Sequence, residues 1–356
     1  MIGIDAGNWL DRPPTGVAVY ARNLIWQLAR QQPHERFGWF FRSNRYFRSL
    51  GRRLPRNARR RLLEQPLLRV GSRDLKLFHG LNQRLPKGVR APCVATYHDL
   101  FALTGEYSTA EFRQRFARLA RETADRADHV IAVSAYTAEQ VASRLGFPRS
   151  RITVVHHGAE PLAIPPPARC EAILANLGVS RPFVLHIGTL QVRKNVGRAV
   201  EAFEAAGGGA SLVLAGGSGF GADRVLERIE HSCARPRIRI AGHVSDDVRA
   251  CLYASAEVLL FPSLEEGFGL PVVEAFSVGL PVIASNASAV KEVAGDAAVL
   301  VDPLSTDEIS GALERVLGSE SLREELRRKG TARARRFTWE RCAAETWRVY
   351  RRLARA

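Results

Sequence analysis

The sequence contains few cysteines, and none of them forms a Cys-x-x-Cys pair. The cysteines are odd in number and far apart: Cys93, Cys170, Cys233, Cys251 and Cys342. This spacing supports neither a disulfide framework nor a metal site built from thiolates. Free thiols are typical of a reducing compartment, so we expect a cytoplasmic protein.

Two further patterns are missing from the chain. No Asp-x-Asp motif follows a predicted strand, which argues against a metal ion that anchors a diphosphate, and we expect no metal and no cofactor. No run of about 18 apolar residues is present that could span a bilayer, and the first residues lack the basic and apolar regions of a secretory signal. We therefore expect any membrane contact to be peripheral, at the inner face of the plasma membrane.

Acidic residues are scarce relative to basic ones. The 52 Lys and Arg residues outnumber the 36 Asp and Glu residues, which gives a formal net charge of +16. Such an excess favours anionic partners, namely nucleic acid, nucleotides or an acidic membrane surface. Eleven arginines and the single acid Glu64 lie within residues 42–73, which we call the Arg-rich segment. This segment is either a solvated basic face or a surface that contacts an anionic membrane.

Short apolar runs alternate with amphipathic helical stretches through most of the 356 residues. This alternation is typical of parallel sheets that are covered by helices on both faces, so the fold class is predicted to be α/β. The predicted strands are residues 2–5, 37–41, 75–78, 93–97, 130–133, 152–155, 183–187, 211–215, 237–241, 258–261, 282–284 and 298–301. The length favours two domains, and each would be a Rossmann-like doubly wound sheet.

A proline-rich stretch at residues 158–182 predicts the linker between the domains, because the run Pro165, Pro166 and Pro167 cannot continue a helix or a central strand. We predict an N-terminal domain of residues 1–172 and a C-terminal domain of residues 173–337. The apolar side chains of the last helix, residues 338–356, are expected to pack back onto the N-terminal domain. Ligands of such sheets bind at the carboxyl ends of the strands, so we expect a central cleft that both domains face.

The most informative segment is residues 261–274, which runs from a buried strand through a glycine-rich loop into a helix. Gly267 and Gly269 allow a close approach of a ligand, and Pro271 suits the first helical turn. The amides expected to face a phosphate at the positive end of this helix are those of Gly269, Leu270, Val272 and Val273. Glu266 and Glu274 would flank the ligand and accept hydrogen bonds from vicinal hydroxyls of a sugar or a ribose.

A second loop follows the strand that ends at Gly188 and delivers Arg193 and Lys194 together. Arginine supplies a planar fork of donors and lysine a point charge. Together they can neutralise the charge that develops on a leaving diphosphate, as a metal ion does in other enzymes.

These motifs resemble the retaining GT-B glycosyltransferases of family 4. The resemblance rests on Glu266-x7-Glu274, on the Gly-Thr-x-x-x-Arg-Lys-Asn loop of residues 188–195 and on Gly-His-Val-Ser-Asp-Asp at residues 242–247. It implies a GT-B fold and is strongest over residues 183–303. Within the family, the chain is most similar to bacterial O-antigen and exopolysaccharide mannosyltransferase-like enzymes.

The resemblance also implies roles for the matching residues. Glu266 and the loop that follows it, with Gly267 and Phe268, would hold hydroxyls of the donor sugar, and Glu274 would hold the ribose diol. Arg193 and Lys194 would bind the diphosphate. The backbone around His243 and Val244 would meet the base.

Two motifs in the first half are also similar to the family pattern. Thr15-Gly16-Val17 resembles the loop that approaches the phosphates, although it has one glycine where many members have two. His98, in the sequence Tyr-His-Asp-Leu, resembles the histidine of the acceptor side. Asp99 would act either as a base or by orienting His98.

The resemblance implies a retaining, metal-independent hexosyltransferase. We expect it to move a hexose, with mannose as our choice, from a GDP- or UDP-linked donor to a glycan or a lipid-linked glycan. One alternative is a nucleotide-sugar epimerase, which uses the same fold and needs no acceptor. A more distant alternative is a nucleic-acid-binding protein that uses the Arg-rich segment, but this segment lacks a recognisable motif and has few aromatics, so we expect no nucleic acid as partner.

Overall fold

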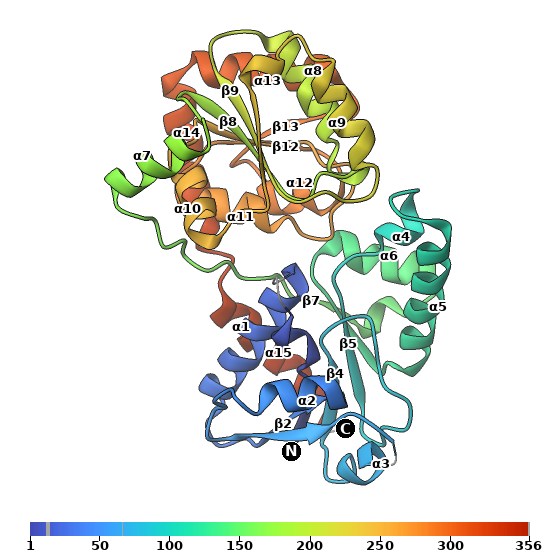
Figure 1. Cartoon of the computed structure of the whole chain (residues 1–356). Helices are drawn as coiled ribbons and strands as arrows, with labels where there is room; N and C mark the ends of the chain where they lie inside the picture. The colour runs from blue at the N-terminus through green and yellow to red at the C-terminus, as the bar shows by residue number, and fades with distance from the viewer. Residues whose placement is uncertain (12–14, 66, 355–356) are drawn as a thin grey trace. The chain divides into compact units, whose positions relative to one another are not determined.

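The computed structural model describes residues 1–11, 15–65 and 67–354, without the side chain of Arg69. The chain forms two compact units, each an α/β sheet with helices packed around it (Figure 1). Unit 1 contains Met1–Thr104, Ala110–Gly158 and Phe337–Ala356. Unit 2 contains Gly105–Thr109 and Ala159–Arg336. The predicted α/β class is confirmed.

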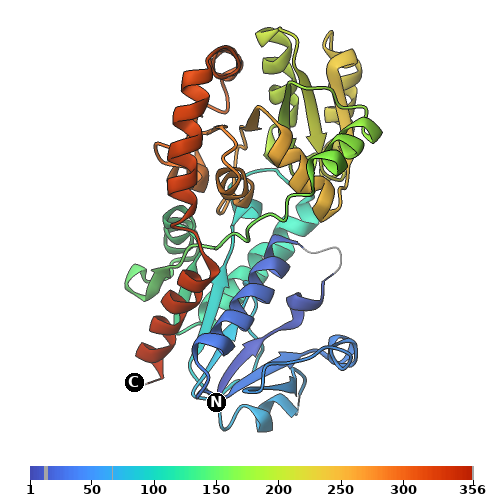
Figure 2. The same ribbon diagram turned by 90° about the vertical axis from the view of Figure 1, so that its left-hand side faces the viewer.

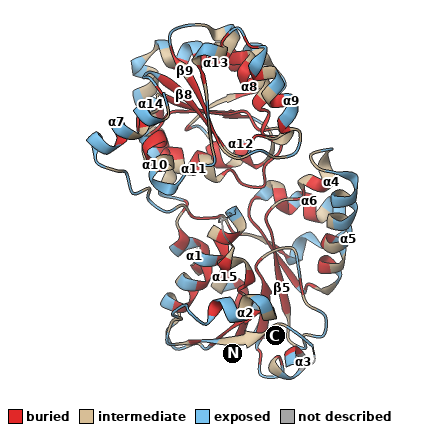
Figure 3. Cartoon of the chain, in the orientation of Figure 1, coloured by how far each residue is buried: buried red, intermediate tan, exposed pale blue. Residues whose placement is uncertain are grey.

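Unit 1 is built on a parallel sheet with the strand order β3-β2-β1-β4-β5-β6-β7 in the described residues. The strands are β1 (Ile2–Asp5), β2 (Phe37–Phe41), β3 (Ala58–Leu62), β4 (Leu77–Gly80), β5 (Cys93–Tyr97), β6 (His129–Ala132) and β7 (Ile152–Val154). The strands β2, β4, β5 and β6 are completely buried, and β5 is drawn red in Figure 3. Burial on both faces explains why they read as continuous apolar runs in the sequence.

The helices of unit 1 follow the strands in the manner of a doubly wound fold. They are η1 (Gly7–Leu10), α1 (Gly16–Gln31), α2 (Ser43–Ser49), α3 (Leu67–Gly71), α4 (Phe101–Thr104), α5 (Ala110–Arg126), α6 (Ala135–Leu145), η2 (Arg149–Arg151) and α15 (Trp339–Leu353). Ser134 caps α6 by accepting from the amide of Thr137 at 3.0 Å.

The Arg-rich segment contains a strand, β3, that the sequence analysis did not predict. Residues 59–61 are three consecutive arginines, and they pair in parallel with β2 at the edge of the sheet. Arg60 turns back to donate to the carbonyl of Ser49 at 2.9 Å. Charged side chains on an edge strand discourage pairing with another chain, so part of the positive charge has a structural use.

The helix α15 belongs to the core of unit 1. It lies beside α1, as the red and blue helices of Figure 2 show, and buries Trp339, Cys342 and Tyr350 there. The hydroxyl of Tyr350 lies 2.6 Å from Nδ1 of His79 on β4. The backbone of Trp339 passes so close to Gly158 that a Cβ on this glycine would lie 2.2 Å from the Trp339 amide nitrogen.

Unit 2 is built on a second parallel sheet with the order β10-β9-β8-β11-β12-β13 in the described residues. Its strands are β8 (Phe183–Ile187), β9 (Ser211–Ala215), β10 (Ile238–Gly242), β11 (Val258–Phe261), β12 (Val282–Ser285) and β13 (Val299–Val301). Its helices are α7 (Pro167–Asn176), η3 (Val192–Lys194), α8 (Val196–Ala206), α9 (Ala222–Glu230), η4 (Arg235–Arg237), α10 (Asp246–Ser255), α11 (Leu270–Ser277), α12 (Ser288–Ala294), α13 (Thr306–Gly318) and α14 (Glu320–Ala334).

The division between the units falls after Gly158, not after residue 172, and the proline-rich stretch contains a helix. Pro167 begins α7, because a proline at the first helical position lacks only an amide that would have no partner inside the helix. The helix α7 packs against α10 of unit 2, where Cys251 Sγ lies 3.5 Å from the carbonyl of Cys170. This packing places residues 159–172 with unit 2.

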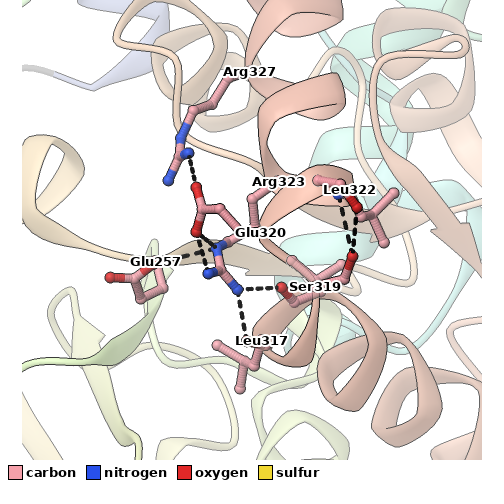
Figure 4. A network of polar contacts seen from close by, with 9 residues as sticks. Glu257, Leu317, Ser319, Glu320, Leu322, Arg323 and Arg327 are labelled. Carbon is pink, nitrogen blue, oxygen red and sulfur yellow. Dashed lines mark hydrogen bonds and ion pairs between the residues drawn. The ribbon is translucent and has the colours of Figure 1, made fainter.

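A polar network joins α13 to α14 (Figure 4). Arg323 on α14 donates to the last carbonyls of α13, those of Val316 at 2.8 Å and Leu317 at 2.6 Å. The same guanidinium forms ion pairs with Glu320 and with Glu257, which lies just before β11. One arginine thus caps a helix end and fixes the next helix against the sheet.

Candidate active site

The loop after β8 is fixed to its neighbours by Asn195. This residue adopts the left-handed region, with φ of 58°, which asparagine tolerates better than most residues. Its side-chain amide donates to the carbonyls of Pro262 at 3.1 Å and Pro303 at 2.6 Å. The carbonyl of Arg193 accepts from the amide of Leu264 at 2.9 Å. The loop of residues 188–195 is therefore held against the loop that follows β11.

Glu266 lies between the two predicted cations. Its carboxylate forms an ion pair with Arg193 at 3.0 Å and a second with Lys194 Nζ. The side chains of Arg193, Lys194 and Glu266 are each 10–11% exposed. Burial alone would raise the pKa of Glu266, but the charges of Arg193 and Lys194 lower it to about 2. Glu266 is therefore ionised at neutral pH and is paired with both cations.

The residues that surround this cluster restrict the position of Lys194. Lys194 Nζ lies 4.8 Å from the centre of the Phe261 ring, an arrangement in which the ring face attracts the cation. Gly188 has φ of +138°, and a Cβ there would lie 3.3 Å from Lys194 Cε. Behind the lysine, burial and the charge of Lys194 lower the pKa of His186 to about 4, so this histidine is neutral. The carbonyl of Leu260 accepts from its Nδ1 at 3.0 Å.

The helix α11 begins directly after the glycine-rich loop. Gly269 precedes it with φ of +102°, a conformation that only glycine adopts readily, and Phe268 is buried. The amide of Val272 donates to the carbonyl of Gly269 at 3.0 Å, so the prediction that this amide is free for a phosphate is wrong. The first turn tightens around the proline at position 271, and the amides of Gly269, Leu270 and Val273 remain predicted phosphate contacts at the positive helix end.

Glu274 lies in the second turn of α11 and contacts two residues of α10. Arg249 forms an ion pair with its Oε1, and Tyr253 donates to its Oε2 at 2.9 Å. The sequence analysis missed both α10 residues, although Arg249 and Tyr253 are four positions apart and so share one face of the helix. His243 is exposed and Val244 half-buried in the loop between β10 and α10. All these residues follow the carboxyl ends of β8, β10 and β11, which lie at one edge of a parallel sheet.

The remaining predicted residues belong to unit 1. Gly16 is the first residue of α1, and Thr15 caps this helix by accepting from the amide of Ala18 at 3.2 Å. His98 follows β5 and is buried, with 8% of its surface exposed. Asp99 follows it and is half-buried.

The protonation of His98 can be deduced from its neighbours. Its Nε2 lies 2.9 Å from the carbonyl of Leu81, which only accepts, so this nitrogen carries the hydrogen. Burial lowers the pKa of His98 to about 4, and the neutral ring has a lone pair on Nδ1. His157 Nε2, 3.2 Å away, is then the donor to that lone pair. His157 is a third residue, after Arg249 and Tyr253, that the sequence analysis did not place among the candidates.

Known proteins are similar to this chain over nearly its whole length. It matches the family described as Glycosyl transferases group 1 over residues 175–333 and the one described as Glycosyltransferase Family 4 over residues 14–161. It is 32% identical to the O-antigen chain mannosyltransferase B of Escherichia coli over 290 residues, which is 79% of this chain and 76% of that protein. The chain belongs to the family 4 glycosyltransferases. The predicted resemblance is confirmed, and the protein is a glycosyltransferase.

Two further similarities place this glycosyltransferase among its relatives. It is 31% identical over 255 residues to the GDP-mannose-dependent alpha-(1-6)-phosphatidylinositol dimannoside mannosyltransferase of Mycobacterium tuberculosis, with 69% of this chain and 63% of that protein covered. Its fold matches the sucrose-phosphate synthase of Thermosynechococcus elongatus with a TM-score of 0.76 at 21% identity, over 99% of this chain and 98% of that chain. The GT-B fold predicted from the sequence is thus confirmed.

The described residues offer neither a cluster of metal ligands nor a membrane-spanning helix. In the part of the chain that the structure describes, no three His, Cys, Asp or Glu side chains gather as metal ligands. No helix built from the described residues has the length and apolar character needed to cross a membrane.

Proposed function

We propose that this glycosyltransferase moves a mannosyl group from a nucleotide diphosphate-sugar to a hydroxyl of a glycan or lipid-linked glycan, with retention of the anomeric configuration and without a metal ion. The names of two relatives support the sugar, since both are mannosyltransferases, and one of them is named as GDP-mannose-dependent. We therefore propose GDP-mannose as the first donor to test and a UDP-sugar as the second.

The observation that carries this proposal is the buried cluster of Arg193, Lys194 and Glu266 beside the positive end of α11. A diphosphate placed there meets two cations and a helix end, which together stabilise the negative charge that develops as the sugar leaves. Because the two cations already carry the charge that a metal ion would supply, we propose that none is needed. Glu266 is ionised and paired, so we assign it to accepting hydrogen bonds from sugar hydroxyls.

In the proposed reaction, the bond between the anomeric carbon and the leaving phosphate oxygen breaks, and the acceptor oxygen bonds to the same face of that carbon. The proton of the acceptor hydroxyl passes to the leaving phosphate oxygen, so no protein carboxylate forms a covalent intermediate. We propose that His98 helps to orient the acceptor and does not transfer a proton, because both of its ring nitrogens have hydrogen-bond partners within unit 1.

The test is a binding panel followed by product analysis. Purified protein is heated with GDP, UDP, ADP and dTDP and their common sugars, each with EDTA and with Mg²⁺, because a ligand that binds the folded state raises Tm. Stabilisation by one nucleotide that EDTA does not change supports the proposal. NMR of the product then gives the anomeric configuration, and conversion of the donor without any acceptor would reveal an epimerase instead.

We also propose that the Arg-rich segment contacts an anionic membrane. Its helices α2 and α3 and the residue that follows α2 expose large apolar side chains, namely Phe47 (69% exposed), Leu50 (55%), Leu67 (56%) and Val70 (61%). Exposed apolar side chains within the Arg-rich segment suit the boundary between headgroups and acyl chains. Co-sedimentation with vesicles that contain anionic lipid, but not with neutral vesicles, is the expected result, and the double variant F47S/L50S should bind less. Equal binding to both kinds of vesicle would contradict the proposal.

A further inference from the structure

The carboxylate of Glu274 is held from both sides by α10. Nη1 of Arg249 forms an ion pair with Oε1, and the Tyr253 hydroxyl donates to Oε2 at 2.9 Å. The other arm of the guanidinium, Nη2, lies 3.1 Å from Oδ1 of Asp246. The arginine therefore bridges the first turn of α10 to the carboxylate on α11.

The partners of Glu274 differ in how firmly they are fixed. Tyr253 is almost completely buried, and burial together with the neighbouring carboxylate raises its pKa well above the usual value, so the phenol keeps its proton. Its hydroxyl also lies 3.3 Å from the carbonyl of Pro271, but its single hydrogen favours the shorter contact with Glu274. The Arg249 side chain is 31% exposed and Glu274 19%, so this ion pair reaches the surface of unit 2.

The contacts leave room for a ligand on the same carboxylate. An ionised carboxylate offers about four lone-pair positions, two on each oxygen. Arg249 and Tyr253 use one position on each oxygen, so one position on each oxygen is left. Two neighbouring acceptor positions match two neighbouring hydroxyls, such as the 2′ and 3′ hydroxyls of a ribose.

We infer that Arg249 is a positioning residue that orients Glu274 so that its two remaining acceptor positions read the ribose diol of the donor nucleotide. The inference rests on the proposed function, because it assumes a nucleotide donor, and it adds a residue to the donor site. Arginine suits this position better than lysine, because its planar fork contacts Asp246 and Glu274 at once while the lysine ammonium is a single point charge.

The test compares ribonucleotides with their 2′-deoxy forms, because only the ribose contact distinguishes them. Binding of GDP, 2′-deoxy-GDP, UDP and 2′-deoxy-UDP is measured by calorimetry for the wild type, R249A, R249K and R169A. Arg169 on α7 forms an ion pair with Asp247 of the same helix α10 but does not contact Glu274, so R169A is the matched control. The ratio of the two affinities is measured on one folded protein, so a general loss of stability does not change it.

For the nucleotide that binds, we expect the wild type to prefer the ribose form by about tenfold or more, as a hydrogen bond to a charged group allows. The preference should fall to about threefold or less in R249A, take an intermediate value in R249K and stay unchanged in R169A, since the orientation of Glu274 depends on the guanidinium fork. R249A should also weaken binding of the 2′-deoxy form less than binding of the ribose form.

Two other outcomes would overturn the inference and are distinguishable from a failure of the proposed function. If R249A keeps the ribose preference while both affinities fall equally, Arg249 has a purely structural role. If the wild type binds a nucleotide without any ribose preference, Glu274 does not read the diol although the donor site exists. If the wild type binds none of these four nucleotides and none of the nucleotides and sugars in the panel above, the proposed function itself is wrong and the inference fails with it.

Discussion

The two units place their charges in opposite ways. In unit 2, Arg193, Lys194 and Glu266 form a buried ionised cluster at the carboxyl ends of the strands. In unit 1, the candidate His98 lies in a buried network of neutral rings, and the arginines of the Arg-rich segment whose side chains the structure describes are exposed or half-buried. The buried charges of unit 2 suit the binding of a single anion, the donor diphosphate that we propose as its ligand. A neutral interior with a basic exterior suits the contact with an anionic membrane that we propose for the Arg-rich segment.

The largest expected effect comes from removing a cation of unit 2. We predict that K194A lowers kcat by about 10²–10³-fold, or about 3–4 kcal/mol, because one preorganised contact to the leaving diphosphate is lost. Turnover is measured by release of nucleoside diphosphate. The matched control is R181A, since Arg181 pairs with Glu171 on the exposed surface of the same unit. Unchanged turnover in K194A would remove this lysine from the mechanism.

The next effect is on stability and comes from the carboxylate of the same cluster. We predict that E266Q lowers the free energy of unfolding at pH 7 by about 3 kcal/mol, because two buried cations lose their charged partner. Since the folded-state pKa of about 2 lies below the ordinary value of 4.5, the stabilisation by Glu266 is present above pH 4.5 and is lost as the pH falls toward 2. Urea unfolding at pH 7 and pH 3.5 should show the gap between variant and wild type narrowing. A constant gap would contradict the pairing.

A third prediction is that acid destabilises unit 1 more than unit 2. Burial lowers the pKa of four histidines in unit 1 and one in unit 2: His79, His98, His129, His157 and His186. The unfolded chain takes up protons below about pH 6.5 that the folded chain excludes, so stability is present above that pH and is lost on acidification. At pH 5 each histidine lowers the unfolding free energy by up to about 2 kcal/mol.

Unit 1 should therefore loosen before unit 2 as the pH falls from 7.5 to 5. Hydrogen exchange followed by mass spectrometry measures this for peptides of each unit, after correction for the intrinsic pH dependence of exchange. Equal loss of protection in both units would show that the buried histidines do not decide the order.

The smallest effect is expected at Gly188. G188A places a Cβ 3.3 Å from Lys194 Cε and strains a backbone with φ of +138°, so we predict a cost of about 1 kcal/mol and a several-fold rise in KM for the donor. The matched control is G197A in α8, where a Cβ would meet no heavy atom within 4 Å. If G188A and G197A have the same KM, the backbone at Gly188 does not position the lysine.

Sequence patterns located the strands of both units well, because buried parallel strands are short apolar runs bounded by glycine and polar residues. The strand β3 was not predicted, because residues 59–61 are arginines and an edge strand needs no apolar face. The glycine-rich loop and the Arg-Lys pair were visible as local motifs. Arg249 was not, because its contact with Glu274 joins two helices that are distant in the sequence.

The position of α15 also affects the order in which the protein can fold during its synthesis. The core of unit 1 includes Trp339 and Tyr350, which are translated after every residue of unit 2. All residues of unit 2 are therefore synthesised before unit 1 has its last helix, and until α15 is in place the apolar side chains of α1 that it covers have no partner there. Unit 2 is free to complete its sheet first, and the unit that begins at residue 1 is the last to close.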